Sequence, residues 1–303
     1  MEIRNLITFV KVAEAGSLTG AARSLGYAQS SVTAQMKQLE QELGCPLYER
    51  VGKKIRITAA GQAFLNYAVK IVRMSEEALE AGKAGALKTG GSLRIGIMDI
   101  LAGTKMAEMV SFYMGQFPEV ELQVRVEYEK DTLLELLRHN EIDLAIILGD
   151  PVSDADLIHA GGDSSETMHF YVAREHPLAE GSDERTVWKA ISGYPLICQD
   201  ETVPWERGLT GQPGAELCRK VRVRSRDLAV EMAGPQAVLY MPEAAVWKQV
   251  QNGDLLRLAD PFPPMTVWRQ TLYHRNKWLT GAMEGWIAME KDTKDDSVKQ
   301  DEG

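Results

Sequence analysis

Positions 29–37 of the sequence carry a run of short hydrogen-bonding side chains together with one lysine. Glutamine can pair with the polar edge of adenine, serine and threonine can bond bases or phosphates, and lysine suits phosphate. The chemistry that these residue types suit is recognition of double-stranded DNA through hydrogen bonds. The set comprises Gln29, Ser30, Ser31, Thr33, Gln35 and Lys37.

Two short helices that cross at a tight turn would present this set on one outward face. The first is expected at residues 18–25, with Ser17 as its N-cap and as a further candidate DNA contact. The second is expected at residues 28–43, with Val32 opening its buried stripe. Gly26 stands at the turn, where a left-handed backbone favours glycine. The pattern is typical of a helix-turn-helix whose second helix enters the major groove. A helical hairpin with a solvated polar face is the alternative.

A basic hairpin is expected directly after the second helix. Two short strands are predicted at residues 47–51 and 54–58, which would form a wing. Arg50, Lys53 and Lys54 lie on or beside it and could reach phosphates or the minor groove. The alternative is a solvated basic hairpin without a DNA contact.

The charge of the chain is unevenly distributed. The 303 residues carry a formal net charge of −9, whereas residues 1–58 contain eight Lys or Arg and five Asp or Glu. The first 58 residues therefore carry +3 and the remainder −12. Binding of DNA phosphates depends on the local charge, so a basic head on an acidic body is compatible with DNA binding.

Three segments resemble the N-terminal part of LysR-type transcriptional regulators: SLTGAARSL, AQSSVTAQMKQLEQELGCPLYER and ITAAGQAFL. The likeness covers residues 1–65 at one-to-one spacing. It implies a winged helix-turn-helix domain at residues 1–58 that binds a promoter or operator as a homodimer or homotetramer. Two positions depart from the family pattern. Ala28 leaves the second helix without a capping hydroxyl, and Ala34 stands where the family often has an arginine.

A long linker helix is expected at residues 59–89, with Thr58 as its cap. The family resemblance implies that it pairs with the same helix of a second subunit, and packing on its own chain is the alternative. Two rows of residues repeat every seven positions. The apolar row is Leu65, Val72, Leu79 and Ala86, and the small row is Gly61, Ala68, Ser75 and Gly82.

Residues 90–290 read as alternating strands and helices, which predicts an α/β fold with a parallel sheet. This region resembles the family's two-lobed sensing domain, which is similar to periplasmic solute-binding proteins. The matching segments are LRIGI, FPEVEL, LLELLRHNEIDLAII, HPLA, GYPLI and GPQAVLYMP. We expect lobe 1 at about residues 90–164 and 266–290, lobe 2 at about 165–265, and a disordered acidic tail at 291–303.

A small-molecule effector is expected between the lobes, at strand ends near helix N-termini. Carboxylates at these ends would repel an anion, so we hypothesise a ligand that is cationic, amine-bearing or rich in hydroxyls. Alternatively, the acids cap helices or pair with Arg224 or Arg226. The candidate segments are Asp99, Ile100 and Leu101; Gln199, Asp200, Glu201 and Thr202; and Gly234 and Pro235.

Cys198 and Cys218 raise a second sensing mode, because some members of this family sense oxidants through two cysteines in the second lobe. Cys198 ends an apolar strand, so a buried inert thiol is the alternative.

Other classes of protein find little support in the sequence. There is no phosphate-binding loop, metal-ligand spacing, cofactor motif or acid–base set, so we expect no cofactor and no enzyme. Three scattered cysteines, no membrane-spanning run and no signal peptide indicate the cytoplasm. A solute-binding protein would fit residues 90–290 alone, but the basic head opposes it. An enzyme of the two-lobed deaminase kind lacks its catalytic residues.

Overall fold

The computed structural model describes residues 1–51, 54–83, 91–161, 163–179, 187–200, 203–212 and 214–301. The chain divides into two compact units, Met1–Leu87 and Lys88–Gly303, called unit 1 and unit 2. Each unit is described by itself. None of the helices in the described ranges is long and apolar enough to span a membrane.

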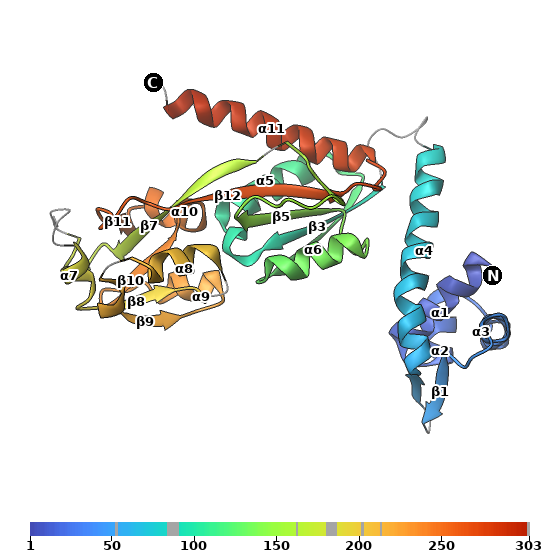
Figure 1. Cartoon of the computed structure of the whole chain (residues 1–303). Coiled ribbons are helices and arrows are strands. Elements are labelled where there is room, and N and C mark those ends of the chain that lie inside the picture. Colours follow the sequence, from blue (N-terminus) through green and yellow to red (C-terminus); the bar gives the residue numbers. More distant parts are fainter. Residues whose placement is uncertain are drawn as a thin grey trace. The chain divides into compact units, whose positions relative to one another are not determined.

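Unit 1 is helical apart from one hairpin. The expected helix-turn-helix and two-stranded wing are both present, and α1 packs on α4 as well as on α2 and α3 (Figure 1). The elements are α1 (Ile3–Ala15), α2 (Leu18–Leu25), α3 (Gln29–Leu43), β1 (Tyr48–Val51), β2 (Lys54–Ile57) and α4 (Ala59–Lys83).

One stripe of α3 is fully buried. Val32, Met36 and Leu39 are each 0% exposed, and they share a core with Leu6 and Phe9 of α1. Their spacing of i, i+4 and i+7 is that of one helix face. The burial of this face leaves the opposite face of α3 pointing outward.

The turns around α3 follow the expectations from the sequence. Gly26 ends α2 with φ +67° and Gly44 ends α3 with φ +70°, which are left-handed values that favour glycine. The Ser17 hydroxyl accepts the backbone N–H of Gly20 at 3.0 Å and so caps α2. Ala28 offers α3 no side-chain cap.

The N-terminal half of α4 packs on unit 1 itself. Thr58 caps the helix by accepting the N–H of Gly61 at 2.9 Å, and Ala68 is 0% exposed. A Cβ added to Gly61 would lie 2.0 Å from the carbonyl oxygen of Leu47. Two members of the small row therefore serve packing within the chain, while Leu79 of the apolar row is 62% exposed.

We predict that Gly61→Ala destabilises unit 1 by roughly 1–3 kcal/mol, because the new methyl group meets backbone that cannot rotate away. Urea unfolding followed by circular dichroism measures the loss. Gly115→Ala is the control, because a Cβ at Gly115 meets nothing within 4 Å. Equal stability of Gly61→Ala and the wild type would contradict the close approach.

Lobe 1 of unit 2 is the part built around β3, β4, β5 and β12. As the alternating order predicts, β3 pairs in parallel with both β4 and β5, and β12 (Thr266–His274) then adds antiparallel to β5. The elements up to the crossing are β3 (Gly91–Met98), the 3-10 helix η1 (Asp99–Leu101), α5 (Thr104–Gln116), β4 (Val120–Glu127), α6 (Lys130–Arg138), β5 (Leu144–Gly149) and β6 (Leu157–His159).

Lobe 2 is the part built around β8, β9 and β10. The strand β7 (Ser164–Ala173) joins the lobes, because its first residues pair with β12 and its later ones with β10. The sheet order is β4-β3-β5-β12-β7-β10-β8-β9, as Figure 1 shows. Lobe 2 contains α7 (Val187–Ile191), β8 (Pro195–Cys198), α8 (Pro204–Thr210), the 3-10 helix η2 (Ala215–Leu217), β9 (Arg219–Arg222), α9 (Arg226–Glu231), β10 (Val238–Pro242), α10 (Glu243–Gln251) and β11 (Leu255–Arg257).

The expectation of a disordered tail at 291–303 is wrong for most of its length. Helix α11 runs over Gly281–Asp301, and its N-terminal part packs on lobe 1 through the buried Trp286. The stretch has no proline, and its only glycine is the last residue, so nothing in it stops a helix that is already started.

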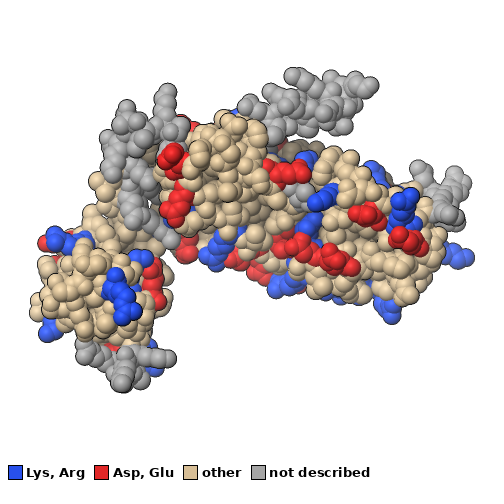
Figure 2. All heavy atoms as spheres, turned by 180° about the vertical axis from the view of Figure 1, so that it is seen from behind, with Lys and Arg blue, Asp and Glu red and all other residues tan. Residues whose placement is uncertain are grey.

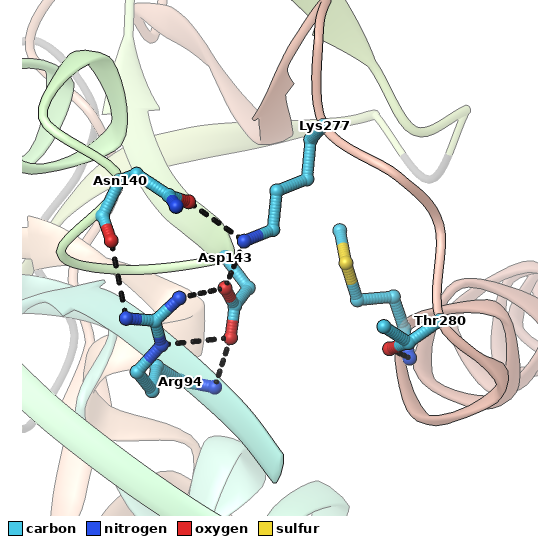
Figure 3. Close-up of polar contacts among 6 residues, drawn as sticks. Arg94, Asn140, Asp143, Lys277 and Thr280 are labelled. Carbon is cyan, nitrogen blue, oxygen red and sulfur yellow. Dashed lines mark hydrogen bonds and ion pairs between the residues drawn. The ribbon is translucent and has the colours of Figure 1, made fainter. Parts of the chain in front are cut away.

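A buried ionic cluster ties the end of β12 to the beginnings of β3 and β5 (Figure 3). The Asp143 carboxylate accepts from the Arg94 guanidinium at 2.5 Å and lies 2.7 Å from the Lys277 ammonium. It also accepts the Arg94 backbone N–H at 2.7 Å, and Lys277 donates to Asn140 Oδ1. The side chains of Asp143 and Lys277 are only 5% and 4% exposed, so each charge needs the other to offset the cost of removing it from water.

We predict that Asp143→Asn destabilises unit 2 by roughly 3–5 kcal/mol, because it removes the negative charge that Arg94 and the buried Lys277 share. Burial raises the pKa of Asp143, but the Arg94 hydrogen bonds and the Lys277 charge outweigh it, so the pKa is lowered overall. This stabilisation is therefore present above the ordinary aspartate pKa and is lost as the pH falls. Denaturant unfolding at several pH values tests it, and a wild-type acid sensitivity retained in Asp143→Asn would contradict it.

Candidate functional site

The outward face of α3 carries most of the predicted DNA-contact residues. Gln29, Ser30, Ser31 and Lys37 are exposed. Ser30 and Lys37 lie opposite the buried stripe, whereas Gln29 and Ser31 are exposed beside it at the N-terminal end of the helix. This part of α3 has no acidic side chain before Glu40. The face can therefore donate and accept hydrogen bonds toward a polyanion without repelling it.

Two of the predicted contacts are half-buried and already bonded inside unit 1. Gln35 Oε1 accepts the hydroxyl of Thr8 on α1 at 2.6 Å, which helps to fix α3 on α1. The Thr33 hydroxyl donates to the carbonyl oxygen of Gln29 at 2.9 Å. Ser17 is likewise half-buried as the cap of α2. As DNA contacts these three stay predictions.

Sequence reasoning missed exposed residues around this face. Tyr27 is 43% exposed just before α3, and Gln38 is exposed one turn beyond Ala34. Gln38 could have been found from the helical period, because residues four apart lie on one helix face and Gln38 comes eight residues after Ser30. Tyr27 gave no such signal, because it lies outside the periodic segment.

The basic side chains of unit 1 differ in their ion pairing. Lys11 pairs with Glu14 at 2.8 Å, and Arg56 of β2 pairs with Glu49 of β1. Within the described part of the chain, Arg23 and Lys37 have no carboxylate partner. The face of unit 2 seen in Figure 2 instead carries acidic and basic side chains interspersed. Among the described side chains of α1, α2 and α3, Arg23 and Lys37 are thus the cations that phosphates could engage most directly.

The wing has the predicted register but only part of its basic set is described. Arg50 pairs with Ile55 and Val51 with Lys54 across the β1–β2 hairpin. The backbone of Arg50 and Lys54 is described, whereas their side chains and the whole of Lys53 lie outside the described residues.

In unit 2, the first predicted ligand segment follows β3. The half-buried Asp99 accepts the backbone N–H of Arg226 at 2.6 Å, so it links lobe 1 to α9 of lobe 2. Burial raises the pKa of Asp99, against the lowering effect of this hydrogen bond. Ile100 and Leu101 are 0% and 4% exposed in the core, so their side chains offer no accessible surface. They are large apolar side chains that follow β3, and burial in the core removes them from water.

The second predicted segment follows β8 and also reaches lobe 1. The Asp200 N–H donates to the Tyr128 hydroxyl at 3.2 Å, and the Asp200 carboxylate lies 3.6 Å from Arg224 Nε. Arg224 also pairs with Glu129 at 2.7 Å and lies over the Tyr128 ring at 4.4 Å. Gln199 is buried, and Glu201 and Thr202 lie outside the described residues. Asp99 therefore contacts Arg226 and Asp200 contacts Arg224, the two residues named in the alternative interpretation.

The third predicted segment lies at the wrong end of lobe 2. Gly234 and Pro235 precede β10, whose Val238 pairs in parallel with Leu196 of β8. They therefore lie near the N-terminal ends of these strands, whereas Asp200 follows a C-terminal end. The prediction that they join the inter-lobe site is wrong. Beside them is a depression of about 470 Å³, lined by Tyr194, Pro195, Arg219, Met232, Gln236 and Ala237 among others.

A further segment that meets lobe 1 is Arg224–Arg226, which follows β9. The same rule that selected Asp200 would have found it, because β9 runs parallel to β8 and ends at the same edge. The sequence alone suggests Arg224 and Arg226 only as partners for the acids.

The two cysteines of lobe 2 are too far apart to form a disulfide in this structure. Pro195 of β8 pairs with Arg219 of β9, so Cys218 lies about four residues along the strands from Cys198. At ~3.3 Å per residue this is ~13 Å, beyond the Cα separation of a disulfide. Burial and the Glu206 carboxylate also raise the pKa of Cys198, which disfavours the reactive thiolate. This geometry does not support the redox alternative.

Comparison with known proteins decides the family. Residues 3–62 match the family described as "Bacterial regulatory helix-turn-helix protein, lysR family", and residues 88–294 match "LysR substrate binding domain". The chain belongs to the LysR family of transcriptional regulators. It is therefore a DNA-binding regulator with an effector-binding domain, as the sequence indicated.

Relatives and solved structures agree with the two-part organisation of this LysR-family regulator. The HTH-type transcriptional regulator YofA of Bacillus velezensis is 33% identical over 94% of this chain and 96% of its own. CbnR in complex with its target DNA has a TM-score of 0.66 at 20% identity, covering 96% of this chain and 99% of CbnR. LysG of Corynebacterium glutamicum, with bound effector Arg, has a TM-score of 0.59 at 19% identity, covering 96% and 99%.

Proposed function

We propose that this regulator reads its operator with the outward face of α3 and holds the flanking phosphates with Lys37 and the wing. The observation that carries the proposal is the division of α3 into two faces. One is fully buried through Val32, Met36 and Leu39, and the other exposes Ser30 and Lys37 with no acid. A helix with this division suits the major groove. The similarity to CbnR, which is solved with its target DNA, supports the same mode.

We propose that the active form is a homodimer or homotetramer. Tyr67 and Met74 of α4 are each 64% exposed, a large apolar area for one helix to leave in water. Among the described strands of unit 2, β4 and β9 end the sheet, and each has one edge without a strand partner. Val126 on β4 and Leu228 beside β9 are 47% and 54% exposed. A second copy would cover these surfaces, and two heads would compensate for the modest charge of each.

We propose that a small-molecule effector binds between the lobes of unit 2 and changes the contacts that cross between them. Asp99 with the Arg226 N–H, and Asp200 with Tyr128, join the lobes. A ligand there must replace or extend these contacts. Cationic or hydroxyl-rich ligands would bond the carboxylates, whereas an anion would compete with them for Arg224 and the Arg226 N–H. LysG, solved with an arginine effector, is similar in fold.

We also propose that the protein is a cytoplasmic regulator without enzymatic activity. This fits the family and the lack of a catalytic set in the sequence. A solute-binding protein would have no use for the cationic, acid-free face of α3.

For DNA recognition, we predict different effects of two α3 substitutions. Lys37→Ala removes one phosphate contact, so it should weaken binding to all duplexes and reduce the slope of log affinity against log salt by about 0.9. Gln29→Ala should instead reduce the preference for the operator over random duplex by about 1–3 kcal/mol. Fluorescence anisotropy on promoter fragments captured by the protein measures both.

The matched control is Lys11→Ala, which removes the same charge from α1, where Lys11 pairs with Glu14. It should leave the salt slope unchanged. A slope change equal to that of Lys37→Ala, or an unchanged operator preference in Gln29→Ala, would contradict the assignment of α3.

For effector binding, we predict that one chemical class from a panel of cations, anions and polyols binds the full chain saturably in isothermal titration. Asp99→Ala and Arg224→Ala should each change its affinity by about tenfold or more, because each removes a charged hydrogen-bonding group. Lys37→Ala should leave it unchanged. If a ligand binds Asp99→Ala and Arg224→Ala as tightly as it binds the wild type, it does not occupy the inter-lobe site.

A further inference from the structure

Glu206 of α8 is a carboxyl group that is buried without a cation. The residue is 1% exposed, and it forms no ion pair in the part of the chain that the structure describes. Its Oε1 accepts the backbone N–H of Gln199 at 3.0 Å, and the Cys198 thiol hydrogen-bonds to it. The strand end of β8 is thus fastened to α8 through one carboxyl group.

The charged and titratable groups around Glu206 come from three strands. The Cys198 thiol lies on β8, Lys220 and Arg222 act from β9 at longer range, and Tyr240 acts from β10. Burial raises the pKa of Glu206 to about 7 and outweighs the lowering effects of the Gln199 N–H, the thiol and the two cations. The carboxyl group therefore changes charge near neutral pH.

The segment held by Glu206 is the one that reaches across to lobe 1. Asp200 follows Gln199 directly, donates to the Tyr128 hydroxyl and lies beside Arg224. The Cys198 carbonyl accepts the Val223 N–H at 2.9 Å, so the start of the Arg224 segment is fixed to the same strand end. Movement of this strand end would alter the contacts between the lobes.

We propose that Glu206 positions the Gln199–Asp200 segment and that the charge of its carboxyl group controls the contact between the lobes. As a route of regulation, this inference rests on the proposed effector role of unit 2. Glu206 is a positioning residue, because it acts on lobe 1 through Asp200.

The direction follows from linkage. Because the folded pKa is raised, the arrangement that buries Glu206 is favoured by its proton. This contribution is fully present below the ordinary glutamate pKa, and it is lost as the pH rises through the folded value. Raising the pH from about 6 to about 8 should therefore release α8 and the end of β8 toward conformations that hydrate the carboxylate.

Hydrogen–deuterium exchange of the full-length protein at about pH 6, 7 and 8 tests this, after correction for the intrinsic exchange rates. In the wild type, the protection of backbone amides in residues 196–200 and 204–210 should fall with pH, by up to about tenfold per pH unit above the titration. Glu206→Gln, a neutral side chain of the same shape, should keep this protection constant. Glu175→Gln, at an exposed carboxyl of the same lobe, should behave like the wild type.

A second reading compares infrared spectra of the wild type and Glu206→Gln. The wild type should show a carbonyl band of a protonated carboxyl group that the variant lacks, and this band should disappear with a midpoint near 7. Protection that does not change with pH, a Glu206→Gln profile that follows the wild type, or the absence of this band would overturn the inference. Failure to select any promoter over random duplex would instead overturn the proposed function, so the two failures are distinguishable.

Discussion

The packing of α3 against α1 is the constraint on which the proposed DNA recognition depends. Val32, Met36 and Leu39 are fully buried, and the Thr8 hydroxyl bonds Gln35 beside them. Rotation of α3 about its axis would expose this apolar stripe to water and bury polar groups, and both changes are unfavourable in free energy. The outward face of the helix is therefore held in place by the core, and DNA meets a surface that is already formed.

Three carboxyl groups of unit 2 are held in different ways. Asp143 is matched by two cations within lobe 1 and fixes strand ends. Asp99 is matched by a backbone N–H of lobe 2 and so joins the lobes. Glu206 has no cation and is held by an N–H and a thiol. The pKa of Asp143 is lowered by its cations, whereas burial raises the pKa of Asp99 and of Glu206, so pH acts on these contacts in opposite directions.

The sequence predicted the helices of unit 1 and the parallel core of unit 2 because these elements follow a local period. It failed where strand direction or tertiary packing decides. Gly234 and Pro235 were assigned to the inter-lobe site from their nearness to an apolar strand, although they precede that strand. Ile100 and Leu101 follow the correct strand, but their apolar side chains turn into the core. The charged stretch after 290 continues a helix that was started by a buried segment, which composition alone did not reveal.

The central claim is that the exposed face of α3 lies against base edges in the major groove. Photocrosslinking from a photoreactive amino acid placed at Ser30, with the same group at Lys11 of α1 for comparison, measures this most directly on captured operator DNA. The account predicts crosslinks from position 30 to bases of the operator and none from position 11. Crosslinks from position 11 with none from position 30 would contradict it.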